Sequence, residues 1–341
     1  METRKLQRVG GGTYTVSIPK QWATTHGLEA GTAVNLYTHL DGSIVVRSHA
    51  KDGGNLATVR IEVDGEGPDR VRRALRAAQA VGFESVTLVS DVPFTAEERR
   101  AVNAMVRGLV GTEVVDERDD ELTVRNLLDA SDVSVRQSVV QLQFVALSIH
   151  RRATASLTAA NDEAYDQLRE RESEADRLFE MVSRHFTRAL ISLEEVDRLG
   201  TTRPELFDYY ETARQLRALA SQGVGIARAT RRLSEPLPDA VADDVSAVAD
   251  ATRTVVEDAS GAVLDAGDAE SVHRVFDARD EARARVDALD ERLTDEWIDC
   301  LGDAAVAIAV ARTVDSLART LDHGAAVADV ALRARTRTEN L

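Results

Sequence analysis

Helical periodicity over a long stretch constrains the fold of this chain more than any other feature. From residue 131 to residue 335, apolar residues recur at positions i, i+3, i+4 and i+7 in six segments. Residues 139–149 and 178–190 show the pattern clearly. Amphipathic segments joined by short loops fold into up-and-down helical bundles. We predict helices at residues 131–159, 162–193, 204–233, 239–266, 269–299 and 303–335.

The predicted helices form two similar trios, separated by a loop that contains Pro236 and Pro238. The sequences of the two trios are alike in two places. On the second helix of each trio, residues 172–180 resemble residues 283–291, and on the third helix, residues 215–227 resemble residues 316–328. Self-similarity at a spacing of about 105 residues predicts an internal repeat. The repeat would give two three-helix bundles, at residues 131–235 and 239–335.

Between the N-terminal section and the helices, residues 55–128 alternate strand and helix patterns, which predicts a small α/β domain. The predicted strands are residues 57–64, 85–90, 112–117 and 121–126, and the predicted helices are 68–82 and 95–111. The section has no Gly-rich phosphate loop, no clustered histidines and no nucleophile–base pair. We interpret it as a structural spacer, with a ligand-sensing unit as the alternative.

The first 50 residues form a separate section in the order strand, short helix, strand, tight turn, strand. Apolar and polar residues alternate over residues 13–18, and Pro19 ends that predicted strand and suits the first turn of a helix. The other predicted elements are a helix at 20–27 and strands at 32–40 and 43–48. A section of about 50 residues buries little hydrophobic core by itself. We therefore predict that it dimerises through interleaved strands.

The charge of the chain is strongly acidic and unevenly distributed. Its formal charge is −16, and only three of its 42 basic residues are lysines, which is typical of proteins from extreme halophiles. Residues 1–50 carry five basic and three acidic residues, a charge of +2, so the remainder carries −18. A small basic section on an acidic body indicates that this section contacts an anion.

Several classes of protein are disfavoured by the sequence. Cys300 is the single cysteine, so neither a disulfide framework nor a cysteine zinc cluster is expected. The polar start does not read as a signal peptide, and the longest apolar stretch, residues 304–311, is too short to span a bilayer. No catalytic constellation is evident. We therefore predict a cytoplasmic protein that is not an enzyme and is not inserted in a membrane.

Residues 4–48 resemble the AbrB/MazE/SpoVT family of swapped-hairpin DNA-binding modules. A basic start and a glycine run precede Ile18-Pro19-Lys20, and Leu28, Gly31 and Val34 follow at the family's spacing. The resemblance implies a small swapped-hairpin β-barrel, an obligate homodimer and a basic face laid on DNA. The implied DNA contacts are Arg4, Lys5, Arg8, Thr13, Ser17 and Lys20.

The glycine run itself predicts a close approach of the strand end to a phosphate backbone, because glycine adds no side chain and tolerates positive φ. A different interpretation remains open for the section. It would be a dimerisation module whose basic residues do not contact DNA.

Residues 131–335 resemble PhoU, the phosphate-uptake regulator family, which has two tandem three-helix bundles. Residues 314–332 follow the family's third-helix pattern. A head of the AbrB type joined to such a body resembles archaeal phosphate regulators, of a haloarchaeal type. The resemblance implies regulation of phosphate uptake through a phosphate transporter or a sensor protein. It also implies Glu/Asp-x-x-x-Asp motifs whose carboxylates bind metal clusters.

Carboxylates at i and i+4 lie on one helix face, so a pair of them can chelate a hard cation. The candidate ligands for a divalent or iron-type metal ion are Glu172, Asp176, Asp287, Asp322 and His323. Only Glu172 and Asp176 keep the family's paired spacing. Arginine, serine or alanine replaces an acid at the other motifs, namely at Arg217, Ser221, Arg283 and Ala318. These departures favour a metal site that is lost or reduced, and a solvated acidic face is the alternative for the remaining pair.

Two functional hypotheses follow. The first is a dimeric DNA-binding regulator of phosphate uptake or metabolism, with the head on DNA and the bundles sensing or docking a partner. The second is a scaffold that does not bind DNA, in which the head only dimerises the chain and the acidic bundles bind a transporter or sensor protein.

Overall fold

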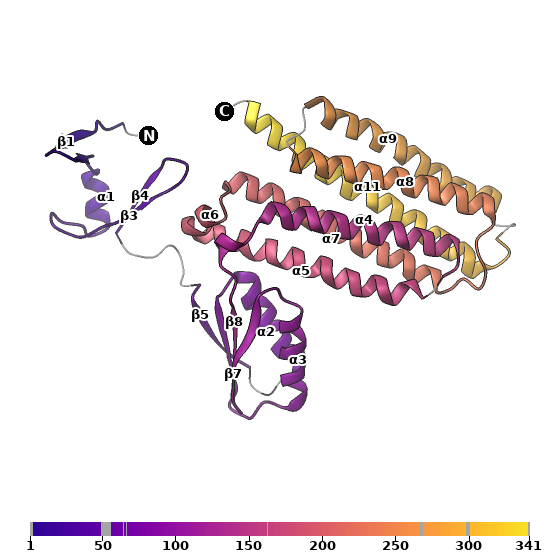
Figure 1. Cartoon of the computed structure of the whole chain (residues 1–341), viewed down its shortest axis with the longest axis horizontal. Coiled ribbons are helices and arrows are strands. Elements are labelled where there is room, and N and C mark those ends of the chain that lie inside the picture. Colours follow the sequence, from indigo (N-terminus) through magenta and orange to yellow (C-terminus); the bar gives the residue numbers. More distant parts are fainter. Residues whose placement is uncertain are drawn as a thin grey trace. The chain divides into compact units, whose positions relative to one another are not determined.

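The computed structural model describes residues 3–48, 56–63, 65, 67–161, 163–265, 269–297 and 301–339. The chain has a mostly helical, multidomain layout (Figure 1). Its internal contacts divide it into two compact units, residues 1–55 and residues 56–341. We refer to them as the head and the body. Cys300 lies outside the described residues, as do the ends of two predicted helices, residue 266 and residues 298–299.

The head contains two antiparallel hairpins and one short helix. Its elements are β1 (Gln7–Val9), β2 (Thr13–Thr15), α1 (Lys20–Thr25), β3 (Asn35–Thr38) and β4 (Ile44–Arg47). Gly10 opens the β1–β2 turn with a φ of +65°, and Gly42 lies in the β3–β4 turn with a φ of +84°. Only glycine adopts such values without strain, so the chain can reverse sharply at both turns.

The head differs from the sequence prediction at its first strand. We predicted a strand over residues 13–18, but β2 ends at Thr15, because its partner β1 begins at Gln7 and pairs with Thr15 there. The sequence did not predict β1. The glycine run is therefore the turn of a hairpin rather than only a flexible start to a strand. In this single chain the two hairpins form separate two-stranded sheets, and the predicted swapped-hairpin barrel of two chains stays a prediction.

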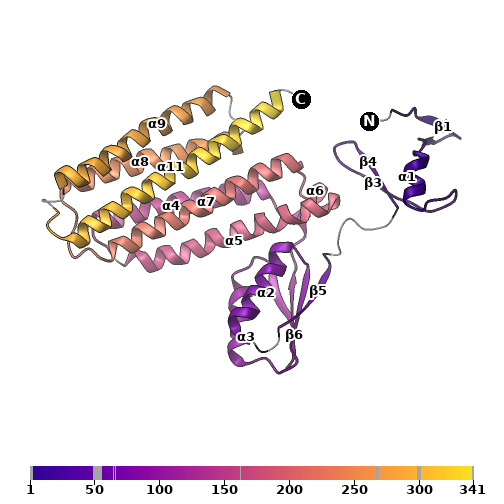
Figure 2. The same ribbon diagram turned by 180° about the vertical axis from the view of Figure 1, so that it is seen from behind.

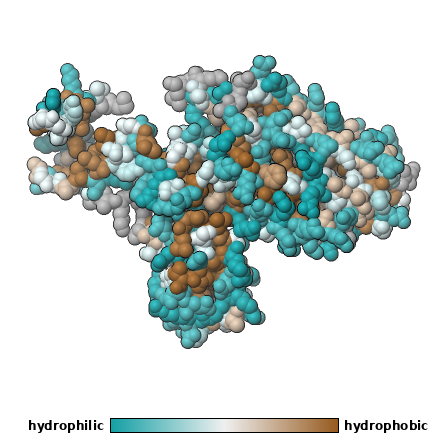
Figure 3. Space-filling model, in the orientation of Figure 1, coloured by the Kyte–Doolittle hydropathy of each residue, from teal (hydrophilic) through white to brown (hydrophobic). Residues whose placement is uncertain are grey.

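The described part of the head, residues 3–48, has no core of its own. None of residues 3–48 is buried. Leu6, Tyr14, Leu36, Leu40 and Ile44 each expose between 66% and 75% of their surface. Brown, hydrophobic residues are accordingly visible on the surface of the head in Figure 3. Soluble domains bury such side chains against another element.

The body begins with a mixed four-stranded sheet and two helices. The strands are β5 (Thr58–Glu62), β6 (Ser85–Val89), β7 (Thr112–Glu117) and β8 (Glu121–Asn126), and the helices are α2 (Pro68–Val81) and α3 (Ala96–Arg107). The strand order is β5-β6-β8-β7, with β5 parallel to β6 and the other pairs antiparallel. Figure 2 shows α2 and α3 on one face of this sheet. Leu75, Val86, Leu88, Leu122 and Val124 form the centre of the core between them.

Long helices form the rest of the body. They are α4 (Val135–Thr158), α5 (Ala164–Ile191), α7 (Arg203–Thr230), α8 (Asp239–Leu264), α9 (Ala269–Arg292) and α11 (Ala304–Glu339). Short helical segments flank them: η1 (Ala130–Asp132), α6 (Leu193–Arg198) and η2 (Leu293–Trp297). Helices α4, α5 and α7 contact one another, and so do α8, α9 and α11. One continuous hydrophobic core runs through both trios.

Two glycines occupy corresponding places in the two trios. Gly223 on α7 lies against Ile149 and His150 on α4, and Gly324 on α11 lies against Val255 and Val256 on α8. The two glycines also correspond in the similar stretches of sequence. Each lets the third helix of its trio approach the first helix closely. The structure thus agrees with the predicted repeat at the level of a specific helix contact.

The helices and strands of the body lie within a few residues of where the sequence predicts them, apart from two breaks. The helix predicted from residue 131 begins as α4 at Val135, because Val133 and Ser134 are extended and separate it from η1. We predicted one helix over residues 162–193, but Ser192 adopts an extended conformation and ends α5. Its side chain accepts a hydrogen bond from the backbone N–H of Glu195 and so begins α6. Within the described residues, no helix is long and apolar enough to cross a membrane.

Candidate functional site

The residues predicted to contact DNA are all exposed on the head. Lys5 precedes β1, Arg8 lies within β1, and Lys20 begins α1. One guanidinium nitrogen of Arg8 donates to the carbonyl oxygen of Gly11 at 3.3 Å, across the glycine turn. No hydrogen bond or ion pair of the Lys5 or Lys20 side chain is found among the described residues. These cationic side chains are therefore open to an external anion.

The two hydroxyl candidates lie on the same stretch of chain. Thr13 begins β2 opposite Val9 of β1, and Ser17 follows the end of that strand. Both are exposed. Arg4 is exposed as well and precedes Lys5 at the start of the described chain. The six predicted contacts thus belong to one small unit, and whether they bind DNA stays a prediction.

The predicted metal-binding face is crossed by hydrogen bonds between the second and third helices of the first trio. Arg217 Nε on α7 donates to Asp176 Oδ1 on α5 at 2.6 Å. Ser221 Oγ on α7 donates to Glu172 Oε1 on α5 at 2.8 Å. Arg217 and Ser221, which stand at two of the predicted motif positions, therefore bind the acids of α5. Each carboxylate already has a partner from the chain itself.

The second trio has a contact at the corresponding place. The guanidinium of Arg283 on α9 forms an ion pair with Asp322 on α11. In the two similar stretches Arg283 corresponds to Glu172, and Asp322 corresponds to Ser221. In each trio one residue of this pair is acidic, and the other residue donates a hydrogen bond to its carboxylate. The contact between second and third helices is thus retained while the side chains that make it are exchanged.

The other two metal candidates lie apart from this contact. His323 Nδ1 is 2.9 Å from Gln215 Oε1, which links α11 to α7 of the other trio, and burial lowers the pKa of the imidazole below its ordinary value. Asp287 is exposed on α9. In the portion of the chain that the structure describes, no three His, Cys, Asp or Glu side chains are grouped so that they could hold a metal ion.

A buried polar cluster joins the α/β section to the helices, and sequence reasoning missed it. Glu195 on α6 is 4% exposed and accepts from two side chains of α5: His185 Nδ1 at 2.7 Å and Arg188 Nε at 2.9 Å. Burial alone would raise the pKa of Glu195, but these two partners outweigh burial and hold it below the usual value. Arg188 also donates to the carbonyl oxygen of Gly82 and to Glu84 Oε1.

A sequence signal for this cluster exists. Arg184, His185 and Arg188 lie on α5 among apolar residues of the segment 178–190, at positions that face the interior. Long charged residues are seldom fully buried unless they are paired. Charged side chains at interior positions of an amphipathic helix therefore indicate buried partners, although the sequence does not indicate which acids supply them.

Comparison with known proteins identifies the head as a domain of a known family. The family described as "Antidote-toxin recognition MazE, bacterial antitoxin" matches residues 7–53, of which residues 49–53 lie outside the described part. The head is thus a domain of the AbrB/MazE type. No curated protein matches the chain. The matched region ends before the helices, so the likeness of residues 131–335 to PhoU stays a prediction.

Proposed function

We propose that this chain is a homodimeric DNA-binding regulator. In this proposal two heads associate and bind DNA, and the helical body senses phosphate status or docks a partner protein. The observation that supports it most strongly is the head itself, a MazE-type domain that exposes both its apolar and its basic side chains.

Dimerisation follows from the lack of a core. A folded unit of this size is stable only if apolar surface is removed from water. Tyr14 on the first hairpin and Leu36 and Ile44 on the second are each more than 60% exposed in the single chain. A second head that interleaves its hairpins with the first would bury these side chains and pair the open strand edges. Domains of this type are often dimeric, which agrees with this assignment.

DNA binding follows from the charge that remains exposed. The head carries +2 and the rest of the chain −18, so a polyanion is attracted to the head and repelled by the body. The glycine turn beside Arg8 leaves room for a phosphate backbone, because Gly10, Gly11 and Gly12 have no neighbouring atoms at the positions of their missing side chains. Two heads double the number of cations, which matters because each phosphate contact adds to a salt-dependent affinity.

The role of the body rests on its repeat and on the likeness to PhoU. Two trios of helices share one core and present an acidic surface, which suits a basic surface on a partner protein. We assign the partner to the phosphate transporter or to a sensor protein that reports phosphate status. The hydrogen-bonded acids of α5, Glu172 and Asp176, favour a body in which metal binding is lost or reduced. The proposal assigns no catalysis to the chain.

A mobility-shift assay with the full chain and a pool of random duplex DNA tests the proposal. The double variant K5Q/K20Q removes two exposed ammonium groups from the head, and Arg169→Gln removes an exposed cation from α5 as the control. We expect the double variant to bind DNA at least about tenfold more weakly and Arg169→Gln to bind like the wild type. Absence of a shift at every ionic strength would refute the proposal.

The scaffold alternative predicts a different outcome. If the heads only dimerise, light scattering gives the mass of a dimer while no DNA is bound. Crosslinking in cells, read by mass spectrometry, then recovers transporter or sensor subunits and no DNA.

A further inference from the structure

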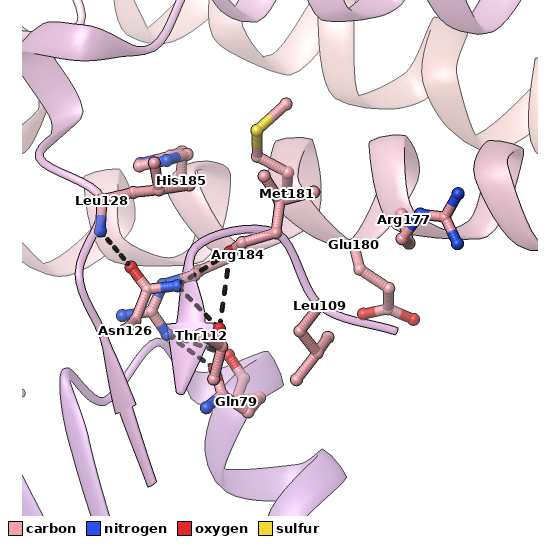
Figure 4. A pocket seen from close by; sticks show the side chains of 11 residues that line it. Gln79, Leu109, Thr112, Asn126, Leu128, Arg177, Glu180, Met181, Arg184 and His185 are labelled. Carbon is pink, nitrogen blue, oxygen red and sulfur yellow. Dashed lines mark hydrogen bonds between the residues drawn. The ribbon is translucent and has the colours of Figure 1, made fainter. Parts of the chain in front are cut away.

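One buried cation in the body donates to no carboxylate among the described residues. Arg184 on α5 is 7% exposed and faces the C-terminal end of α2. One of its guanidinium nitrogens donates to Gln79, to the carbonyl oxygen at 3.5 Å and to Oε1 at 3.3 Å (Figure 4). Both acceptors are neutral and both contacts are long. Burial lowers the pKa of Arg184 to about 10, so the guanidinium stays protonated at neutral pH.

The nearby acids are occupied by other arginines. Glu195 and Glu84 both accept from Arg188, at 2.9 Å and 3.0 Å. Asp129 accepts from Arg198 at 3.5 Å. Removing a cation from water without a hydrogen-bonded counter-charge costs several kcal/mol. The charges of Glu195 and Glu84 act on Arg184 through space, but neither carboxylate accepts a hydrogen bond from it.

A cavity lies beside this arginine. Its volume is about 220 Å³, and Arg184, His185, Arg188 and Arg198 line it together with Glu84, Asp129 and Glu195. Arg184 and His185 also line a second, smaller cavity with Gln79 (Figure 4). The three acids and three arginines that line the larger cavity carry equal and opposite charge. Of these arginines, Arg184 is the one that donates to no carboxylate.

Two further nitrogen atoms at this place have no hydrogen-bond partner. His185 Nε2 is buried without one, while His185 Nδ1 is engaged with Glu195. Gln79 Nε2 is buried without one as well, and it carries two N–H donors. Buried polar atoms are nearly always hydrogen-bonded in folded proteins. The Gln79 amide nitrogen is a donor, and it lines the smaller cavity, so an acceptor atom of a ligand there would satisfy it.

We propose that Arg184 and His185, which line both cavities, bind a small oxyanion, and that Gln79 completes the site from the smaller cavity. A guanidinium pairs with two oxygens of such an anion, and this pairing is the strongest kind of hydrogen bond that arginine makes. The larger cavity is below the usual size of pockets for drug-sized ligands, and an anion of a few atoms suits it.

This site is independent of DNA binding, because every residue that forms it belongs to the body. Arg184 and His185 are on α5, Gln79 is on α2, and the cavity is lined by η1 and α6 as well. The anion would thus connect the α/β section to the first trio of helices. Its occupancy would stabilise that connection.

Thermal unfolding of the full chain without DNA tests the site, with inorganic phosphate, sulfate and acetate added separately at constant ionic strength set by chloride. We expect at least one of these anions to raise Tm, since a ligand that binds only the folded state stabilises it. Arg184→Gln should lose this shift. The control Arg169→Gln, on the exposed side of the same helix, should keep it. No shift with any of the three anions, or an equal shift in Arg184→Gln, would overturn the proposal.

A second variant keeps the test decisive if Arg184→Gln does not fold. Gln79→Met retains the volume of the side chain and removes the N–H donors while Arg184 remains. Titration calorimetry with the anion that gives the largest shift should show about one site per chain in the wild type and several-fold weaker binding in Gln79→Met. Equal affinity in the two proteins would exclude Gln79 from the site, and heat that does not saturate would exclude the site itself.

Discussion

Gly223 on α7 lies directly against Ile149 on α4. A Cβ atom at residue 223 would be 2.8 Å from Cγ2 of Ile149 and 3.1 Å from the backbone nitrogen of His150. No such separation occurs between normally packed atoms, so an alanine would force the helices apart. Gly324 makes the corresponding approach to Val255 and Val256, at 3.1 Å and 3.2 Å. A close helix contact in each trio therefore depends on a glycine.

We expect Gly223→Ala to lower the free energy of unfolding by about 1–2 kcal/mol. Overpacking costs about 1–3 kcal/mol, and the higher helix propensity of alanine recovers about 1 kcal/mol. Gly225→Ala is the matched control, because the nearest atom to its Cβ would be Ser316 Oγ at 4.0 Å. That variant should be more stable than the wild type in urea denaturation. Equal stabilisation of both variants would show that the helices do not approach closely at Gly223.

His150 should make the stability of the body dependent on pH. The imidazole is fully buried, and burial followed by the charge of Arg253 lowers its pKa to about 3. A guanidinium nitrogen of Arg253 lies 3.4 Å from Nδ1 of His150, and Thr320 Oγ1 lies 3.2 Å from Nε2. The neutral ring can therefore accept a hydrogen bond from Arg253 at Nδ1 and donate one to Thr320 from Nε2. The unfolded chain binds a proton at this residue below about pH 6.5 and the folded chain does not.

The contribution of His150 is therefore complete above about pH 6.5 and is lost as the pH falls toward 3. The loss amounts to at most about 1.4 kcal/mol per pH unit. We expect His150→Gln to flatten the fall in unfolding free energy between pH 6 and pH 4, measured by urea denaturation. His273→Gln, at an exposed site on α9, should leave it unchanged. Identical pH profiles for the wild type and His150→Gln would contradict this assignment.

The acids of α5 should hold little metal while their hydrogen bonds are intact. Asp176 accepts from Arg217 and Glu172 accepts from Ser221, so a cation would have to displace a guanidinium. We expect the wild type and Glu172→Gln to retain equal, near-zero amounts of manganese after dialysis. The double variant R217E/S221D places two acids opposite the existing pair and should retain more. One metal ion per wild-type chain, lost in Glu172→Gln, would contradict this expectation.

Dimerisation of the head should depend on its exposed apolar residues. Leu36 on β3 is 66% exposed in the single chain, and Leu36→Glu would place a charge in the proposed interface. We expect the dimer dissociation constant of this variant to rise at least about tenfold in sedimentation. Val92→Glu, at a site of the body that is 51% exposed, is the control and should remain dimeric. A monomeric wild type would refute the proposed dimer.

Much of the body could be predicted from the sequence, because its pattern is strong and local. The helices from α4 to α11 bury one face over several turns, so their apolar residues recur with the helical period. The strands β5 and β6 alternate because one face lies on the core formed with Leu75 and Val102. The break between α5 and α6 at Ser192 could not be predicted in this way. The apolar residues keep their helical spacing on both sides of Ser192, so the sequence shows no interruption there.

Features that depend on contacts distant in the sequence could not be predicted. Strand β1 has three residues, too few to show alternation, and its pairing with β2 depends on the turn at Gly10. Arg184 meets Gln79 more than a hundred residues away, so no local pattern reveals that it is buried without an acid. The replacements Arg217 and Ser221 were visible in the sequence, but their hydrogen bonds to α5 required the helices to be placed side by side.

The salt dependence of DNA binding tests the central claim most directly. Fluorescence anisotropy of the full chain on a labelled duplex gives the observed association constant over a range of potassium chloride concentrations. If two heads place Lys5 and Lys20 on phosphates, the K5Q/K20Q variant loses four contacts per dimer, and the slope of log K against log salt flattens by up to about 4. The account predicts that flattening, with no change in Arg169→Gln. Equal slopes for the wild type and K5Q/K20Q, or no binding at the lowest salt, would contradict it.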